Sequence, residues 1–360
     1  MKRLALAVVA LLALGGCKRQ KIPDALHVFV GPTGGCAQTK PHPKVGTFAC
    51  WGNVFEGGEE KAYARAFPFF DGKLRGISLG AHHACATTDD GKPFCWGDGA
   101  RGQLGPTSAA SRTPIAVGAA GATKPEAVAA GGSHSCVRGE EGDTLRCFGE
   151  NGDGQLGLTA EKSDWDRAQV IKTVVLGEAQ TCAAYTSDGG KDPYILCRGR
   201  NMPKEPLLAG HLATQLTVGA DHACAILQNR SVQCWGKNDD GQLGDGTNTS
   251  SLVPVVVSGA AGAVVIAAGA HHTCALLANR TVTCWGKNDR HQLSSGTTTR
   301  SNKAEVVVGL VQVRDLAAGG DASCAILDDG LVSCWGANDH HELGDGTADE
   351  HNVPAPVKYR

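Results

Sequence analysis

The sequence predicts an all-β fold, a seven-bladed β-propeller built from repeats of about 50 residues with four strands in each blade. Fourteen of the 15 cysteines fall into seven consecutive pairs, and the first members of the pairs recur every 42 to 51 residues. Short Val-rich segments separate the pairs. Glycine is abundant, at 49 residues, whereas aromatic residues make up 5% of the chain. This composition is typical of short strands joined by tight turns.

The first residues have the pattern of an exported bacterial lipoprotein. Lys2 and Arg3 precede an apolar run over residues 4–14. Such a run is shorter than the roughly 20 residues that span a bilayer, but it suits a signal peptide. The Leu-Gly-Gly-Cys that ends at Cys17 resembles a lipobox, in which the cysteine is diacylated and becomes the first residue of the mature chain. An ordinary secretory signal followed by an unrelated cysteine is the alternative.

This interpretation divides the chain into a signal peptide over residues 1–16, a lipidated tether over 17–25 and a propeller over 26–357. The basic stretch Lys18-Arg19-Gln20-Lys21 lies where it can contact anionic headgroups beside the lipid. No aspartate follows Cys17, and the resemblance therefore favours the outer membrane in a bacterium with two membranes. The formal net charge of −2 gives no reason to expect nucleic-acid binding.

The cysteines predict one disulfide in each blade. The predicted pairs are Cys36 with Cys50, Cys85 with Cys95, Cys136 with Cys147, Cys182 with Cys197, Cys224 with Cys234, Cys274 with Cys284 and Cys324 with Cys334. Counting outward from residue 279, the centre of a three-residue turn, places Cys274 directly opposite Cys284. Opposed residues of a non-hydrogen-bonded antiparallel pair have Cα atoms about 4.5 Å apart, within reach of a disulfide. Zinc ligation and free thiols are alternatives, although zinc sites favour close Cys-x-x-Cys pairs and the sequence has none.

The repeat itself is plain around the later pairs. Residues 268–286 read AGAHHTCALLANRTVTCWG, and the fullest copy of the loop that follows is NDDGQLGDGT over 238–247. This pattern resembles the regulator-of-chromosome-condensation repeat in its bacterial, Cys-rich form. The resemblance covers roughly residues 26–357; it is strong in blades two, five, six and seven, fair in three, and poor in one and four. It implies a protein-binding role, since the family includes exchange factors for a small GTPase and a secreted inhibitor of β-lactamases. An exported, disulfide-bonded chain would not meet a cytosolic GTPase.

The strand pattern also predicts how the ring closes. An outer strand over residues 253–257 and a strand over 264–268 precede the sixth Cys pair. The chain begins without such an outer strand and ends with an unused one over 353–357. We therefore expect the C-terminal strand to pair with the N-terminal blade, which removes an exposed sheet edge.

Two recurrent side chains are weighed as structural or functional. The residues that follow the second cysteine of each pair are Trp51, Trp96, Phe148, Arg198, Trp235, Trp285 and Trp335. Packing between blades is favoured over stacking on a sugar or a base. His83, His134, His222 and His272 precede the first cysteine by two, and His82 and His271 neighbour two of them. Because the position recurs once per blade, we favour hydrogen bonds to backbone carbonyls over a metal site. The 238–247 loop is interpreted as a turn rather than a calcium site.

No nucleophile elbow, phosphate loop or metalloprotease motif occurs, so we predict a protein without catalysis, cofactor or metal. Departures from the repeat, in the long turns of blades one and four and after the second cysteine of blade four, supply candidate binding residues, although drift explains them equally. These are Lys40, His42, Lys44, Asp188, Lys191, Asp192, Arg198 and Arg200. Both turns are expected on one face. The preferred function is an envelope module, expected to be monomeric, that binds an unknown protein partner. A glycan-binding or hydrolytic propeller, marked by carboxylates in the channel, is the alternative.

Overall fold

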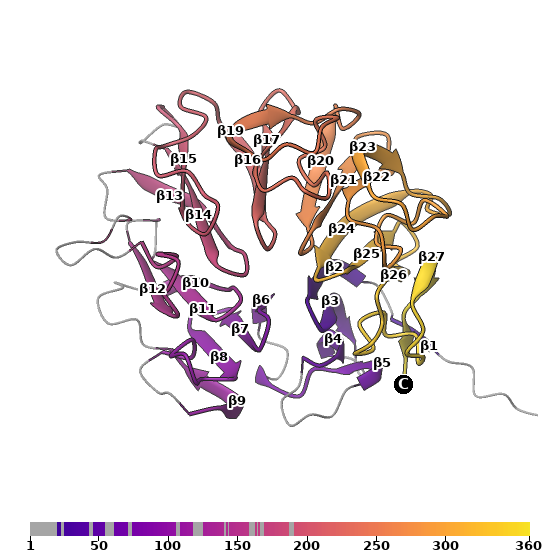
Figure 1. Ribbon diagram of the computed structural model, residues 1–360. Coiled ribbons are helices and arrows are strands. Elements are labelled where there is room, and N and C mark those ends of the chain that lie inside the picture. The colour runs from indigo at the N-terminus through magenta and orange to yellow at the C-terminus, as the bar shows by residue number, and fades with distance from the viewer. Residues whose placement is uncertain are drawn as a thin grey trace, which may run out of the picture.

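The structure is a computed structural model. It describes residues 20–22, 25–42, 46–54, 61–70, 74–105, 109–117, 125–139, 142, 144–157, 163, 165, 169–186 and 191–360. Seven sheets surround a central axis in chain order, so the first and last blades are neighbours (Figure 1). The predicted all-β, seven-bladed propeller is confirmed. Cys17, Lys44 and Asp188 lie outside the described residues. No helix in the described ranges has the length and apolar character needed to cross a membrane.

A complete blade has four strands that lie side by side, the first next to the axis and the fourth at the rim. Blade one consists of β2 (Ala25–Gly31), β3 (Gly34–His42), β4 (Gly46–Gly52) and β5 (Lys61–Ala66), and blade two of β6 (Leu74–Leu79), β7 (His83–Thr88), β8 (Pro93–Gly97) and β9 (Ser111–Ala116). Blade five consists of β16 (Ala213–Val218), β17 (His222–Leu227), β18 (Val232–Gly236) and β19 (Ser251–Val256), and blade six of β20 (Ala263–Ala268), β21 (His272–Leu277), β22 (Val282–Gly286) and β23 (Ser301–Val306). Blade seven consists of β24 (Val313–Gly319), β25 (Ala322–Leu327), β26 (Val332–Gly336) and β27 (His351–Pro356).

Blades three and four have three strands each within the described residues. Blade three consists of β10 (Pro125–Ala130), β11 (His134–Gly139) and β12 (Leu145–Gly149), and blade four of β13 (Val170–Leu176), β14 (Gln180–Thr186) and β15 (Tyr194–Gly199). In blade four a single antiparallel bridge between Ile195 and Leu207 lies where other blades have their fourth strand. The weak repeat pattern of this blade thus corresponds to a simplified rim.

All seven cysteine pairs are disulfides, and each joins the second and third strands of its own blade. In chain order the bonds join Cys36 with Cys50, Cys85 with Cys95, Cys136 with Cys147, Cys182 with Cys197, Cys224 with Cys234, Cys274 with Cys284 and Cys324 with Cys334. The bonded residues are direct partners in the ladders, as Cys274 and Cys284 are between β21 and β22. Their Cα atoms lie 4.0–4.1 Å apart, because they occupy closely spaced antiparallel positions. Local hairpin geometry therefore sets the pairing.

Replacing Cys274 and Cys284 together by alanine is expected to lower the free energy of unfolding by about 2–3 kcal/mol. The bond closes a loop of sequence separation 10, and its removal lets the unfolded chain gain entropy. Urea unfolding followed by circular dichroism measures the change, with wild-type protein under the same oxidising conditions as the control. An unchanged midpoint and slope would show that this disulfide does not stabilise the blade.

The strand over residues 353–357 does not pair with the N-terminal blade, and that part of the prediction was wrong. β27 pairs with β26, with Cys334 opposite Ala355, so the outer strand of each blade follows its Cys hairpin in the chain. In a regular repeat the outer strand can belong either to the Cys hairpin before it or to the one after it. Only the strand pairing shows which of the two it joins. The C-terminal end does close the ring, through the two-residue strand β28 (Lys358–Tyr359), which runs parallel to β5 with Tyr359 opposite Ala64. β1 (Gln20–Lys21) then pairs outside β28.

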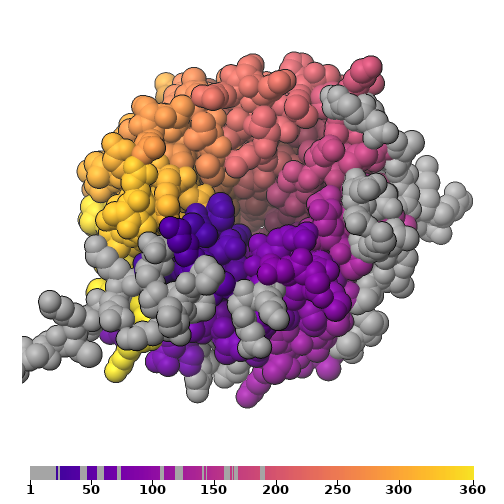
Figure 2. All heavy atoms as spheres, turned by 180° about the vertical axis from the view of Figure 1, so that it is seen from behind, coloured from indigo at the N-terminus to yellow at the C-terminus, as the bar shows by residue number. Residues whose placement is uncertain are grey.

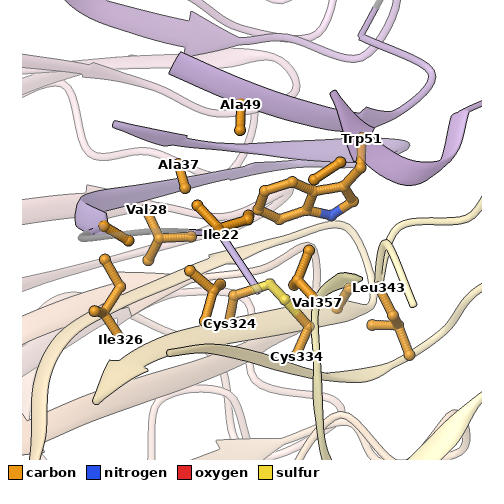
Figure 3. Close-up of a cluster of buried hydrophobic side chains, with 14 residues drawn as sticks. Ile22, Val28, Ala37, Ala49, Trp51, Cys324, Ile326, Cys334, Leu343 and Val357 are labelled. Carbon is orange, nitrogen blue, oxygen red and sulfur yellow. A yellow bond between two sulfur atoms is a disulfide. The ribbon is translucent and has the colours of Figure 1, made fainter. Parts of the chain in front are cut away.

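A buried cluster fastens this junction. Trp51 packs with the Cys324–Cys334 disulfide and Val357 of blade seven (Figure 3). Ile22, only 2% exposed, inserts its side chain into the same cluster. The segment predicted as a tether therefore contributes to the propeller from Gln20 onward.

Candidate functional site

Each blade presents two connections at one end of its strands. In blade five these are the turn over residues 219–221, between β16 and β17, and the loop over 237–250, between β18 and β19. We call this end of the ring the loop face. The opposite end, the turn face, carries the turns between second and third strands, such as residues 228–231. Viewed face-on, the ring is hollowed at its centre (Figure 2).

The hollow consists of two cavities of about 250 and 330 Å³ that are lined mainly by the innermost strands. Their walls are largely aliphatic, with side chains such as Leu79, Leu176 and Val218. Among the described lining residues Glu178 is the one carboxylate, and it lies 3.7 Å from the guanidinium of Arg200. Glycoside hydrolysis ordinarily uses a pair of carboxylates. The described channel lining thus offers apolar contact rather than an acid–base pair.

Glycines at the channel mouth allow neighbouring blades to touch through their backbones. A Cβ atom added to Gly131 would lie 2.6 Å from the carbonyl oxygen of Gly177, and one added to Gly219 would lie 2.5 Å from that of Gly269. The amide of Ala220 donates to the carbonyl of Ala270 at 2.9 Å across the same gap. The glycine of the Ala-Gly-x-x-His pattern is therefore required by close approach between blades.

The recurrent histidines link each blade to the next. The distances from Nε2 to the next blade's hydroxyl oxygen are 2.7 Å for His83–Ser135, 2.9 Å for His134–Thr181, 2.7 Å for His222–Thr273 and 2.8 Å for His272–Ser323. The predicted partner, a backbone carbonyl, was wrong. Ser135 donates its own proton to the carbonyl of Gln103 at 2.9 Å, which leaves its lone pairs to accept from His83. The hydroxyl of Ser135 thus bonds both to His83 and to the loop of blade two that contains Gln103.

These four histidines are buried and neutral near pH 7. Burial, with a smaller contribution from neighbouring histidines, lowers the pKa of His83 and of His222 to about 3. Burial also lowers the pKa of His134 and of His272 to about 4. Each histidine bonds within a different blade junction, so the four are spread around the ring. Within the described residues no group of three or more His, Cys, Asp or Glu side chains has an arrangement that could hold a metal ion.

The histidine is replaced wherever the next blade lacks the hydroxyl. In blades one, four and seven the histidine position holds Gly34, Gln180 and Ala322. The hydroxyl position of the following blade holds Ala84, Ala223 and Gly35, respectively. Gln180 instead donates from Nε2 to the carbonyl of Ala220 at 2.5 Å. Without the hydroxyl, Nε2 of a buried histidine would lose its partner in the next blade, so loss of the hydroxyl removes the reason for the histidine.

One of the interrupted junctions contains a pocket. Between blades one and two a cavity of about 290 Å³ opens at the loop face; we call it the blade 1–2 pocket. Its polar lining includes Asn53, His82 and Asp98, and its apolar wall includes Val54 and Trp96. Asp98 is half-buried, and its Oδ1 accepts from the amide of Ala100 at 2.9 Å. Among the described lining residues Asp98 is the one carboxylate, so this lining favours a cationic or hydrogen-bond-donating group.

Ion pairs join neighbouring loops at other junctions of the loop face. Arg101 contacts Glu150 across blades two and three at 3.1 Å, and Arg200 contacts Asp221 across blades four and five at 3.1 Å. Arg290 of blade six contacts both Asp339 and Glu350 of blade seven, at 2.8 and 2.7 Å. Single exposed pairs contribute little stability, but together these pairs restrain the loops at the junctions that they cross.

The Asn-Asp-Asp-Gly loop is a hydrogen-bonded turn. Asn238 is fully buried; its Oδ1 accepts from the amide of Leu243, and its Nδ2 donates to the carbonyls of Thr247 and Thr249. Asp245 accepts from both the amide and the hydroxyl of Thr247. These carboxylate and amide oxygens serve the loop itself, which supports the turn interpretation over calcium ligation.

The five tryptophans that follow the second cysteines pack between blades. Trp285, for example, lies against the Cys224–Cys234 disulfide of the preceding blade and donates from Nε1 to the carbonyl of Gln242 at 2.9 Å. Trp335 repeats both contacts with blade six. Their fully buried rings are not available to stack on a ligand.

Trp165 supplies the indole that blade four lacks, and sequence reasoning missed it. This ring, 1% exposed, packs against Cys136, Cys147 and Tyr185 and donates to the carbonyl of Leu156 at 2.7 Å. A Cβ atom on Gly157 would lie 2.6 Å from it, just as one on Gly244 would lie 2.8 Å from the Trp285 ring. An unassigned tryptophan just before the blade whose own position holds Arg198 was the available signal.

The candidate binding residues do not form one site. Lys40 and His42 lie toward the turn-face end of β3, and the exposed Lys191 and Asp192 lie at the turn face of blade four. Blades two and three separate these turns on one side of the ring, and blades five to seven on the other. Arg198 donates to the carbonyl of Lys204 at 2.9 Å at the opposite, loop-face end.

Comparisons with known proteins agree with this architecture. The sequence model of the RCC1-like domain matches residues 46–360. Human RCC1 domain-containing protein 1 is 32% identical over 186 residues, 49% of this chain and 48% of that protein. The mitochondrial RCC1 domain-containing protein RUG3 of Arabidopsis thaliana is 28% identical over 222 residues, 55% of this chain and 50% of that protein. The chain thus spans about half the length of these relatives.

A solved structure shows the same fold. Prp20p of Saccharomyces cerevisiae, described with its binding properties to Gsp1p and histones, superimposes with a TM-score of 0.73 at 18% identity. The alignment covers 94% of this chain and 87% of the yeast chain. At this identity the likeness concerns the fold alone.

Proposed function

We propose that this chain, which belongs to the RCC1-like domain family, is an exported, lipid-anchored module that binds a protein partner through its loop face. The observation that carries the proposal is the blade 1–2 pocket, a hollow with a half-buried carboxylate on a surface otherwise held rigid by ion pairs between loops. A preformed surface loses little entropy when it binds, and a pocket on it suits one protruding side chain.

Export is supported by the cysteines and by the N-terminal sequence. Seven disulfides form and persist in an oxidising compartment. The lipobox-like sequence that ends at Cys17 then supplies the anchor, and an outer membrane is favoured in a bacterium with two. Prp20p is described as binding Gsp1p and histones; for this chain we propose a partner in the cell envelope instead, because export separates it from cytosolic proteins.

The pocket indicates what the partner inserts. Asp98 brings the negative charge, while Asn53 and the exposed His82 add hydrogen-bonding groups at the rim. Val54 offers an apolar surface for a hydrocarbon stem. A lysine or arginine has both the stem and the charged end. We therefore propose a basic side chain of the partner as the anchor of the interface.

Replacing Asp98 by asparagine is expected to weaken partner binding at least about tenfold, since an interfacial charge pair truncated on one side ordinarily costs 2 kcal/mol or more. The variant keeps an acceptor for the amide of Ala100. Envelope proteins recovered on immobilised wild type and variant are compared by quantitative mass spectrometry. Asp153→Asn, at an exposed carboxylate on the loop of blade three, is the matched control. Failure to recover any protein repeatedly, or equal recovery on all three chains, would contradict this proposal.

A further inference from the structure

The N-terminal segment is fixed to the rim of the propeller. β1 is the outermost strand of a six-stranded sheet whose order is β1-β28-β5-β4-β3-β2 (Figure 1). Gln20 pairs with Tyr359, and Lys21 with Lys358. The next residue, Ile22, is buried in the junction between blades seven and one (Figure 3). Strand pairing and burial together hold this point of the chain against the ring.

The distance from this fixed point to the proposed lipid is short. Cys17 precedes Gln20 by three residues. Three residues span at most about 11 Å even when fully extended. A lipid on Cys17 would therefore keep β1 within about that distance of the headgroups, whereas the rest of the ring lies inward of this strand.

The rim at this point is basic. We call β1, β28, β5 and Arg360 the closure edge. Lys61 and Arg65 lie on β5, and Lys358 and Arg360 lie on or beside β28. The guanidinium of Arg360 lies 5.6 Å from the centre of the Tyr63 ring on β5. Lys21 lies on β1; outside the described residues, Lys18 and Arg19 precede β1 in the sequence, and Glu56, Glu59 and Glu60 precede β5. Anionic headgroups attract such clusters, at about 1 kcal/mol for each cation near the surface.

The described carboxylate that adjoins this edge is buried and already hydrogen-bonded within its own loop. Asp345, bridged in the backbone to Tyr63, is buried; it accepts from Thr347 and lies 3.1 Å from His351. Exposed carboxylates are instead found on the two faces. On the loop face Asp239, Asp289 and Asp339 pair with Lys237, Lys287 and Arg290, and on the turn face Asp90 pairs with Lys92. The short link from Cys17 to β1, together with the cations on the closure edge, therefore favours this edge over either face as the contact with an anionic surface.

We propose that the closure edge rests on the anionic surface of the membrane that holds the anchor, so that the propeller stands edge-on and leaves both faces open to partners. This inference rests on the proposed lipid on Cys17. It also places the blade 1–2 pocket, in the blades next to the edge, close to the membrane, where a partner that is itself membrane-bound would meet it.

Amine footprinting of the full-length lipidated chain tests this orientation. The protein is reconstituted into phosphatidylcholine vesicles with about 30% phosphatidylglycerol and treated with a membrane-impermeant acetylating reagent, and labelling is quantified for each lysine by mass spectrometry. The Cys17→Ser chain, mixed with the same vesicles, is the unanchored control. Lys61 and Lys358 are expected to react at least about threefold more slowly in the anchored chain. Lys237 on the loop face, Lys92 on the turn face and Lys172 in blade four should react equally in both.

The outcomes separate orientation from anchoring. Protection of Lys237 or Lys92 instead would mean that the propeller lies on a face, and uniform labelling would mean that it does not rest on the bilayer; either result overturns the proposal. A Lys358→Glu/Arg360→Glu chain should lose the protection while its intact mass still includes the lipid. A wild-type mass without a lipid adduct on a chain starting at Cys17 would instead refute the anchor itself, and the inference with it.

Discussion

Replacing Trp165 by alanine is expected to destabilise the folded chain by about 3–5 kcal/mol, the ordinary cost of removing a large buried aromatic ring. The ring is 1% exposed and fills the junction between blades three and four. Its loss would also leave the carbonyl of Leu156 without the indole donor. Urea unfolding measures the difference in free energy.

A second substitution tests whether Trp165 takes the place of the tryptophan that blade four lacks. Arg198 occupies the position from which other blades supply their own tryptophan. Arg198→Trp alone should be destabilising, because the site is already filled. In the Trp165→Ala background the same change should recover part of the lost stability, which gives a favourable coupling energy between the two positions. Additive effects of the two substitutions would show that Trp165 does not take the place of the missing ring.

Acid is expected to destabilise this protein steeply between about pH 6.5 and pH 4. The pKa of His83 and of His222 is lowered to about 3 in the folded chain, and that of His134 and of His272 to about 4, against 6.5 as the ordinary value. In this window the unfolded chain binds protons that the folded chain does not. The free energy of unfolding therefore falls as pH falls, by about 1.4 kcal/mol per pH unit for each histidine. Four histidines give a slope of about 5 kcal/mol per pH unit near pH 5.

One variant isolates the contribution of a single histidine. His222→Gln introduces the residue that blade four has at the equivalent position, Gln180. The slope of unfolding free energy against pH, measured from urea midpoints between pH 4.5 and 6, should fall by about a quarter. His211→Gln, at an exposed histidine, is the control and should leave the slope unchanged. Equal slopes in wild type and His222→Gln would contradict neutral burial of His222.

Features decided within one hairpin could be predicted from the sequence. The spacing of Cys274 and Cys284 around a three-residue turn places them opposite each other, because antiparallel register over so short a distance leaves few alternatives. The blade count follows from repetition of this unit. The packing role of Trp285 could be predicted for a similar reason, since one large apolar side chain per repeat has to be buried somewhere.

Features decided between repeats could not be predicted. Whether an outer strand such as β27 pairs with the blade before it or with the next one cannot be read from the sequence, because the repeat pattern is the same in both cases. The partner of His222 is a hydroxyl 51 residues further along, and the sequence does not say which atoms of the next blade come within reach. Trp165 and the blade 1–2 pocket likewise exist only where neighbouring blades depart from the repeat together.

The sequence by itself thus determined the blade, its disulfide and the number of copies, because local hydrogen bonding and turn chemistry set them, and it alone gives the lipobox-like address at Cys17. The tertiary structure decided what lies between the blades: the closure by β28, the histidine–hydroxyl links and the pocket beside Asp98. The physical reason is that contacts between blades join residues about 50 positions apart. Their side chains meet only after seven similar sheets have packed into a closed ring.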